Sequence, residues 1–436
     1  MKFNRLTQLT PLLSSLIVLP CTCVGQRSFT LSISSTNPSG VIISWRAQSA
    51  TPTPDLVLVP QFQLMRSFNF RDWFPLGSPL TASVGQTLAV TDTNASMACY
   101  RVQSIISQEY AQLSYANLKS GQFQWADLFG GNLFGANLSQ AILTNANLSA
   151  ADVRSADLSS ADFTGADLFD IEAAPAKFDF ARFWNVDAAF ADFENASLFG
   201  VDLTGSDLSS AILTGADLDY ATWTGVKTDA DTQLDPKPLL LLHLVNNPAT
   251  NAVLTNLDLS LASLGGLNFS HANFTGANLN GTDLSGSDLR GANFTSAILS
   301  FVFFNATLMD SNTIIDAKSR LVWQILNQPV SGRDLHGTNL SFVSLFLADL
   351  ISANLTNSTC TSSLLGDANL GKANLTRANF NGADFFGAIL TNANLTLGQF
   401  QSADFTKANL LNATTNGANF NGATFNQTIM PDGTIR

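Results

Sequence analysis

Apolar side chains recur at every fifth position along most of this chain. An Ala stands two places before each of them in residues 141–169, where the recurring column is Leu143, Leu148, Val153, Leu158, Phe163 and Leu168. Asn or Asp mostly fills the place between the two, and Ser, Thr or Gly mostly follows the column. A period of five matches neither the roughly 3.6-residue period of a helix nor the alternation of a strand. The pattern therefore predicts a chain that turns a corner every five residues and sends two of the five side chains inward.

Four such sides make a coil of about 20 residues, and stacked coils hydrogen-bond to one another at the strand spacing of about 4.8 Å. Leu and Phe of neighbouring coils then lie against one another and bury a continuous core. Ala is needed at the other inward position because a larger side chain would collide at the corner. The sequence thus predicts an all-β solenoid with polar outer faces.

Two short segments interrupt the repeat, and they resemble each other. DPKPLLLLHLVNNP, which starts at Asp235, aligns without a gap with DAKSRLVWQILNQP, which starts at Asp316. Each places apolar residues on one face of a helix, and these are Leu240, Leu241, Leu244 and Val245, and Leu321, Val322, Ile325 and Leu326. We expect two short amphipathic helices that cover the exposed ends of solenoid blocks, and a hinge or a dimer contact is the alternative.

The repeated Ala-(Asp/Asn)-Leu-X-X pattern resembles the pentapeptide-repeat family over residues 111–428. This resemblance implies a right-handed quadrilateral β-helix. Members of the family are mostly of unknown activity. A few of them protect or inhibit DNA gyrase by imitating the shape and charge of duplex DNA.

Residues 28–107 lack the five-residue column and alternate apolar and polar residues between turn residues. Such short alternating runs predict a small β-sandwich. The segment resembles the fibronectin-type-III-like modules of bacterial exported proteins. That resemblance rests on Trp45, Arg66-Ser67, Trp73, Asp92-Thr93 and Tyr100-Arg101-Val102.

The first residues have the organisation of a secretory signal peptide. Lys2 and Arg5 precede a short apolar run, small residues follow, and we expect cleavage after Gly25. The run is too short to span a membrane, which takes about 20 apolar residues in a helix. Pro20 argues against lipid attachment at the adjacent Cys21. We therefore expect export to the periplasm, the cell surface or the exterior, without stable membrane insertion after cleavage.

These patterns divide the chain into eight segments, with the repeat region in three parts that we name block 1, block 2 and block 3. The segments are a signal peptide (1–25), a β-sandwich (28–107), block 1 (111–226), a helical insert (227–252), block 2 (253–315), a second helical insert (316–332), block 3 (333–428) and a C-terminal tail (429–436).

Composition and charge exclude several classes of function. A hydrophobic content of 45% with only 12% charged residues argues against disorder. A net charge of −12 and 21 scattered Lys and Arg argue against binding nucleic-acid phosphates. Cys99 and Cys360 remain after signal cleavage and lie in different segments. We expect no disulfide framework, and two small buried apolar side chains instead.

The sequence carries no recognisable catalytic or metal-binding pattern. The three histidines, His243, His271 and His336, have no partners at metal-ligand spacing or in a triad. Gly-containing runs follow the five-residue pattern, which argues against phosphate-binding loops. We expect no enzymatic activity, no cofactor and no resident metal.

Acidic residues form ladders, meaning residues 20 apart that lie on the same face of successive coils. The main acidic ladder consists of Asp127, Asn147, Asp167, Asp187 and Asp207, and a shorter one of Asp152, Glu172 and Asp192. The segment 113–223 holds 15 acids against four bases. Carboxylates facing each other across a ladder repel, at up to roughly 1 kcal/mol per pair. Solvation with some raised pKa values, bound Ca²⁺ or a basic partner would relieve the repulsion. In block 3 the matching ladder, Asn354, Asn374 and Asn394, is expected to hydrogen-bond between coils.

The function that these patterns favour is that of an exported, non-enzymatic solenoid with a structural or protein-interaction role, whose partner is another protein or a cell-surface component. The alternatives are a DNA-mimicking regulator of an enzyme such as gyrase, or a surface protein that binds Ca²⁺ through the main acidic ladder. The ligand, the oligomeric state and the orientation of the three blocks stay open.

Overall fold

The structure is a computed structural model that describes residues 113–436 in full and the backbone of eight strands before them. The chain divides into two compact units. The first unit comprises residues 1–218 and 222–235 and contains block 1, and the second comprises residues 219–221 and 236–436 and contains blocks 2 and 3.

The described strands before residue 113 form two antiparallel sheets. They are β1 (Ile17–Cys23), β2 (Arg27–Thr36), β3 (Gly40–Ala47), β4 (Gln61–Ser67), β5 (Phe74–Pro75), β6 (Leu80–Thr81), β7 (Thr87–Asp92) and β8 (Cys99–Ile105). One sheet has the order β1-β2-β3-β7, and in the other β4 pairs with β5, β6 and β8. β1 falls within the segment predicted to be a signal peptide. The fibronectin-like packing of Trp45 and Trp73 and the cleavage after Gly25 lie outside what the structure describes, so they stay predictions.

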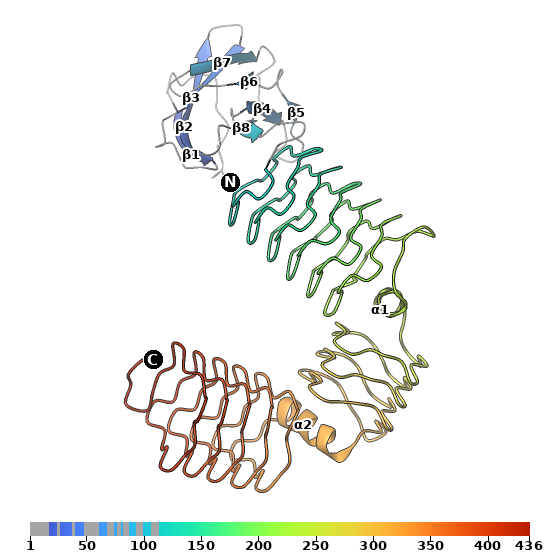
Figure 1. Ribbon diagram of the computed structural model, residues 1–436, viewed down its shortest axis with the longest axis vertical. Coiled ribbons are helices and arrows are strands. Elements are labelled where there is room, and N and C mark those ends of the chain that lie inside the picture. The colour runs from blue at the N-terminus through green and yellow to red at the C-terminus, as the bar shows by residue number, and fades with distance from the viewer. Residues whose placement is uncertain are drawn as a thin grey trace. The chain divides into compact units, whose positions relative to one another are not determined.

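Most coils of the repeat region have the length that the pattern predicts. Parallel β-bridges join Asn147 to Asp167 and Asp167 to Asp187, and the same step recurs in all three blocks. Figure 1 shows the coils of each block as a stack of four-sided loops. Both inward positions are buried, with Ala141 1% and Leu143 0% exposed. The core of each block is therefore a continuous stack of columns along the coil axis.

Most corners are tight turns with one residue in the left-handed region. The N–H of Ala146 donates to the carbonyl of Leu143 at 3.0 Å, and Asn145 between them has a φ of 56°. On the next coil Gly165 occupies the same position with a φ of 67°. A type II turn requires positive φ at its third residue, which Gly and Asn adopt at the lowest cost. The small and polar residues after each column are thus selected first by backbone geometry.

The Asp or Asn beside each column also has a structural role. Asp167 Oδ1 accepts the backbone N–H of Phe169 at 3.0 Å, and Asn147 Oδ1 accepts that of Ser149 at 3.0 Å. These bonds are Asx turns, which Asp and Asn form with the backbone two residues later. The ladder residues therefore stabilise the corners whether or not they carry a charge.

Two columns of block 1 hold Ala in place of a large residue, at Ala173 and Ala188, and both are fully buried. Buried rings from neighbouring columns supply the missing volume, namely Phe163, Phe178, Phe183 and Phe193. The Phe183 ring centroid lies 5.0 Å from that of Phe163 and 5.4 Å from that of Phe178, in edge-to-face arrangements. The core thus conserves its total volume although single positions change greatly in size.

Pro175 causes a local irregularity without a loss of register. The N–H of Ser155 donates to the carbonyl of Pro175 at 2.6 Å, one residue further along than the equivalent bonds of other corners. The next bridge, Asp157 to Lys177, returns to the regular step between coils. The irregularity at Pro175 is therefore confined to one corner.

Blocks 1 and 2 each end on a coil that is longer by one residue, because bridges join Ile212 to Gln233 and Asn293 to Ile314. A loop of the form Asp-X-X-Thr takes up the additional residue in both blocks. In block 1 Asp229 Oδ1 accepts the N–H of Thr232 at 3.0 Å, and Asp310 and Thr313 make the same bond at 3.0 Å in block 2. Bridges of block 1 therefore continue to residue 233, beyond the predicted boundary at 226, because the longer coil hides the five-residue register.

The two inserts contain helices, α1 (Pro236–Asn246) and α2 (Ala317–Asn327). Their buried residues are Leu241, Leu242 and Leu244 in α1, and Ser319, Val322, Trp323 and Ile325 in α2. The predicted faces were wrong in part, since Leu240, Val245, Leu321 and Leu326 are only half-buried. In the part of the chain that the structure describes, no helix has the length and apolar content to span a membrane.

Helix α2 covers the last coil of block 2 and also contacts block 3 (Figure 1). Asp316 caps its first turn by accepting the N–H of Ser319 at 3.1 Å. Trp323 Nε1 donates to the carbonyl of Thr307 in block 2 at 3.1 Å. Lys318 Nζ donates to a block 3 carbonyl at 2.9 Å. The helix therefore satisfies backbone groups that the end of the coil stack would leave unpaired.

The C-terminal tail closes block 3. Ile429 continues the coil ladder and also pairs with Ile435 in an antiparallel bridge. Thr428 and Arg436 exchange backbone hydrogen bonds of 3.1 and 3.0 Å. The tail is a short hairpin that occupies the exposed edge of the last coil, which limits edge-to-edge association.

Candidate functional site

The structure places the predicted ladder residues on successive coils. Bridges run through the main acidic ladder in order, from Asp127 through Asn147, Asp167 and Asp187 to Asp207. Three consecutive carboxylates therefore lie on one side of block 1. The shorter ladder, Asp152, Glu172 and Asp192, is also formed.

Local hydrogen bonds and bases offset much of this charge. Arg154 contacts the Asp152 carboxylate at 2.8 Å and the Glu172 carboxylate at 3.4 Å, so one guanidinium group forms ion pairs with two acidic residues of the shorter ladder. The hydrogen bond from the Arg154 side chain lowers the pKa of Asp152. In the main acidic ladder, the hydroxyl of Ser209 is the chief cause of a lowered pKa of Asp207. The expectation of raised pKa values is therefore wrong for Asp152 and Asp207, because donors at the corners stabilise the carboxylates.

The Asn ladder of block 3 is present, with bridges from Asn354 to Asn374 and on to Asn394. Asn354 Nδ2 donates to Asp334 Oδ1 one coil earlier at 2.9 Å. Asn394 Nδ2 donates to Thr376 Oγ1 at 3.1 Å. The amide side chains thus connect coils, although to Asp and Thr in these two cases.

Within residues 113–436, no group of three or more His, Cys, Asp or Glu side chains is arranged to hold a metal ion. Cys360 is fully buried, and burial raises the pKa of its thiol to about 12. This cysteine is the inert apolar residue that the sequence predicts. The side chain of Cys99 lies outside the described residues.

A second set of surface residues in block 1, which we name the aromatic surface, consists of Phe169, Phe180, Trp184, Phe190 and Phe199. Phe180 is 64% exposed and Phe190 55% exposed. The ring centroids of Phe180 and Phe199 are 5.3 Å apart, and those of Phe169 and Phe190 are 5.2 Å apart. Each pair joins two adjacent coils across a corner. The aromatic surface therefore covers two adjoining sides of block 1 that meet at the corner of Trp184.

Charged residues contact the Trp184 ring of the aromatic surface. The guanidinium carbon of Arg182 lies 4.8 Å from the centroid of the Trp184 ring, and Arg182 also contacts Asp162 at 3.2 Å. Trp184 Nε1 donates to the carboxylate of Asp202. A bridge ladder runs from Asp162 through Arg182 to Asp202, so charges of opposite sign alternate on this side. These contacts therefore hold the Trp184 ring and the Arg182 guanidinium group in place before any partner binds.

The aromatic surface was not predicted from the sequence, although a signal for it exists. Phe180 and Phe190 stand at corner positions with φ of 58° and 62°. Bulky residues rarely adopt this conformation, which costs an ordinary L-residue roughly 1–2 kcal/mol relative to Gly. The Phe180 ring lies over Gly200 on the next coil, where an added Cβ would come within 2.8 Å of it. Large aromatic residues at positions that normally hold Gly, Asn or Ser were the available clue.

Comparison with known proteins agrees with the repeat pattern. The family profile described as pentapeptide repeats matches eight copies, over residues 132–168, 176–215, 249–281, 268–310, 363–397 and 399–431. From about residue 130 to about residue 430, this chain belongs to the pentapeptide-repeat family. The comparison with curated proteins gives no match.

Solved pentapeptide-repeat structures resemble the chain. HetL of Nostoc sp. strain PCC 7120, involved in heterocyst differentiation regulation, is 24% identical over 73% of this chain and 93% of its own, with a TM-score of 0.20. Rfr23 of Cyanothece 51142 is 34% identical over 22% of this chain and 66% of its own, with a TM-score of 0.22. QnrB1, a plasmid-mediated fluoroquinolone resistance protein, is 19% identical over 44% of this chain and 88% of its own, with a TM-score of 0.18.

Proposed function

We propose that this pentapeptide-repeat protein is an exported, non-enzymatic solenoid that binds a partner protein through the aromatic surface of block 1. The observation that carries the proposal is the exposure of Phe180 and Phe190 at left-handed corners. A sequence that departs from local backbone preference without an evident gain in stability points to a functional constraint.

The composition of the aromatic surface supports this role. Aromatic residues and Arg are enriched at the centres of protein interfaces, where a few of them supply most of the binding energy. The aromatic surface combines such rings with Arg182 and is bordered by acidic residues, including Asp187 of the main acidic ladder. We therefore propose a partner whose contacting face carries an excess of Lys and Arg.

The test compares the wild-type protein with a double variant, Phe180→Asn and Phe190→Asn. Each protein is used as bait to capture cross-linked proteins from envelope fractions. Asn adopts positive φ readily, so the corners of block 1 are expected to stay folded. We expect the affinity for the captured partner to fall at least tenfold, because each lost aromatic anchor costs about 1–2 kcal/mol. Quantitative mass spectrometry identifies the partner, and titration with the purified partner gives the affinities.

Leu397→Asn provides the matched control. Leu397 is 43% exposed and has a φ of 59°, so the substitution changes the same kind of corner in block 3. This variant should bind the partner as the wild-type protein does. Equal capture by all three proteins would exclude the aromatic surface as the binding site.

Export rests on the predicted signal peptide and is tested separately. N-terminal sequencing of protein recovered from the envelope or the medium should find a mature chain that begins at Gln26. Recovery of the intact N-terminus from the cytoplasm would contradict export. It would also make the DNA-mimic alternative the next to test, by inhibition of gyrase supercoiling.

A further inference from the structure

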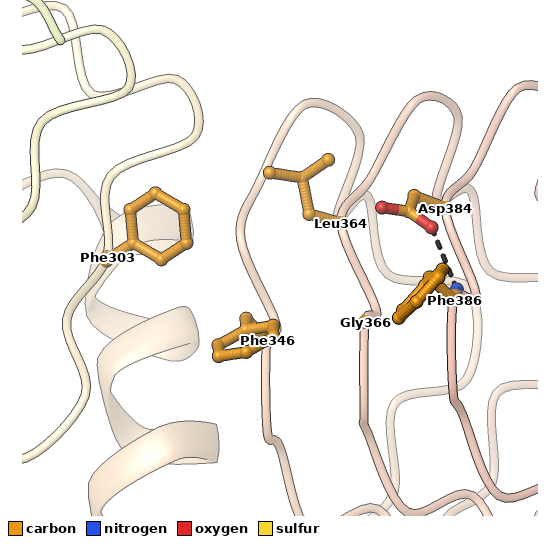
Figure 2. Close-up of a pocket in the computed structure, with 6 residues that line it drawn as sticks. All are labelled: Phe303, Phe346, Leu364, Gly366, Asp384 and Phe386. Atoms are coloured by element: carbon orange, nitrogen blue, oxygen red, sulfur yellow. Dashed lines mark hydrogen bonds between the residues drawn. The ribbon is translucent and has the colours of Figure 1, made fainter. Parts of the chain in front are cut away.

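A pocket of about 270 Å³ opens on the second unit where the end of block 2 meets the beginning of block 3. Figure 2 shows its lining residues, which are Phe303, Phe346, Leu364, Gly366, Asp384 and Phe386. Phe303 belongs to block 2, and the other five come from three successive coils of block 3. The ring centroids of Phe303 and Phe346 are 6.4 Å apart at an angle of 77°. The junction is held beside the pocket by a 2.9 Å bond from Asn305 Nδ2 to the carbonyl of Phe346.

The space arises from a missing side chain in a ladder of rings. Phe346, Gly366 and Phe386 occupy one corner position on successive coils, and Figure 2 shows the Gly366 backbone between the two Phe residues. Gly366 does not have the positive φ that demands glycine at other corners. A Cβ there would lie 3.1 Å from Phe346 Cδ2 and 3.7 Å from the carbonyl of Phe386. The glycine therefore contributes no side chain between two residues whose backbones lie two coil spacings apart, about 9.6 Å, and the Phe346 ring lies close to it.

The pocket attracts positive charge. Asp384 lines it and is followed on the next coil by Asp404. Asp384 Oδ1 accepts the N–H of Phe386 at 2.8 Å, which fixes the orientation of the carboxylate (Figure 2). Lys407 Nζ lies 4.9 Å from the centroid of the Phe386 ring, so this ring already takes part in one cation–π contact. Three aromatic rings and one oriented carboxylate form an arrangement that recognises weakly hydrated cations.

Two buried oxygens near the junction of blocks 2 and 3 have no hydrogen-bond partner, namely Asn305 Oδ1 and Ser344 Oγ. Asn305 follows the pocket residue Phe303 by two positions, and Ser344 bridges to Leu364. Ser344 is only 1% exposed. Because neither residue lines the pocket, the recognition of a bound group rests on the three rings and Asp384.

We propose that this pocket binds the guanidinium group of an arginine side chain on a partner polypeptide. Guanidinium is flat and weakly hydrated, stacks on aromatic rings and carries five N–H donors that suit a carboxylate. The pocket volume of about 270 Å³ lies below the range of roughly 300–1,000 Å³ that is usual for small-molecule sites. It therefore fits one side chain. This site is separate from the aromatic surface of block 1, so either proposal can fail without the other.

In the test, the peptide acetyl-Gly-Arg-Gly-amide is titrated into the full chain, and binding is followed by the NMR signals of labelled Phe rings. We expect saturable binding. The same peptide with citrulline, which keeps the shape and loses the charge, should bind about tenfold more weakly. The peptide with Lys should also bind more weakly, because its ammonium neither stacks nor forms a bidentate contact with the carboxylate.

Three variants distinguish binding in the pocket from nonspecific electrostatic attraction. Asp384→Asn keeps an acceptor for the Phe386 N–H and removes the charge, and it should weaken binding about tenfold. Asp404→Asn removes an equal charge one coil away and should change the affinity less than twofold. Gly366→Phe continues the ring ladder, fills the gap and should abolish binding, while hydrogen exchange confirms that block 3 stays folded.

Four results would overturn the proposal. They are equal affinity for the Arg and citrulline peptides, equal effects of the two Asp variants, undiminished binding to folded Gly366→Phe, or no saturable binding at about 10 mM peptide. The Phe180→Asn and Phe190→Asn variant should bind the peptide as the wild-type protein does, which distinguishes this test from that of the block 1 surface.

Discussion

Phe183→Ala is expected to destabilise the middle of block 1 by about 4 kcal/mol, within the range of roughly 3–5 kcal/mol for buried Phe. The Phe183 side chain is fully buried and lies against Phe163, Phe178 and Phe193. The neighbouring column at Ala188 cannot fill the cavity because its side chain ends at Cβ. The loss should therefore include the full cost of an unfilled space in addition to the lost transfer energy.

Hydrogen exchange resolved by peptide is the suitable measurement, because the two units need not unfold together. A loss of about 4 kcal/mol lowers amide protection in residues 163–203 roughly a thousandfold. Coils contact mainly their neighbours, so protection in the second unit should not change. Phe183→Leu is the control and should cost less than about 1.5 kcal/mol, because it keeps most of the volume. Equal effects of the two variants would show that the core of block 1 relaxes around a cavity.

Trp323→Ala is expected to destabilise the second unit by about 3–5 kcal/mol. Trp323 is 9% exposed, and its Nε1 donates to the carbonyl of Thr307 in block 2. The guanidinium carbon of Arg320 also lies 5.7 Å from its ring centroid. Removal of the indole would leave the last coil of block 2 uncovered and one backbone carbonyl without its donor. Protection should fall in the last coil of block 2 and in α2, while block 1 stays unchanged.

Trp323→Phe separates the two contributions of this residue. It keeps most of the buried ring and removes the Nε1 donor, so it should cost about 1–2 kcal/mol, the usual loss when a buried hydrogen bond is broken. If Trp323→Ala leaves protection of the block 2 end unchanged, α2 does not stabilise the coil that it covers.

Much of the architecture could be predicted because each pentapeptide forms its own corner. The inward pair Ala141 and Leu143 and the regular step between coils follow from a local pattern that repeats many times. The positions of the inserts could be predicted for the same reason, since a break in a regular period is visible without knowledge of the fold. The boundary of block 1 was misplaced because one additional residue in the Asp229 loop shifts that period without ending the coil.

The candidate sites were less predictable because they depend on which residues lie on adjacent coils. The main acidic ladder could be derived from the length of a coil, but the donors that lower the pKa of Asp207 depend on side-chain geometry at the corner. The contact between the Phe180 and Phe199 rings across a corner could be recognised only in the structure. In α2 the apolar pattern favoured Leu321, whereas the buried residue is Trp323, because only the indole reaches the Thr307 carbonyl.

The sequence by itself therefore determined the solenoid, its inward residues and the membership of its ladders, because these follow from short-range periodicity. The tertiary structure alone decided that Trp323 of α2 is buried, how the rings of block 1 pair, and that Phe303 and Phe346 meet at a pocket beside Gly366. The contacts of α2 and the contact between Phe303 and Phe346 join segments that share no repeat register. Their formation depends on the fit of particular side chains, which a periodic pattern does not encode.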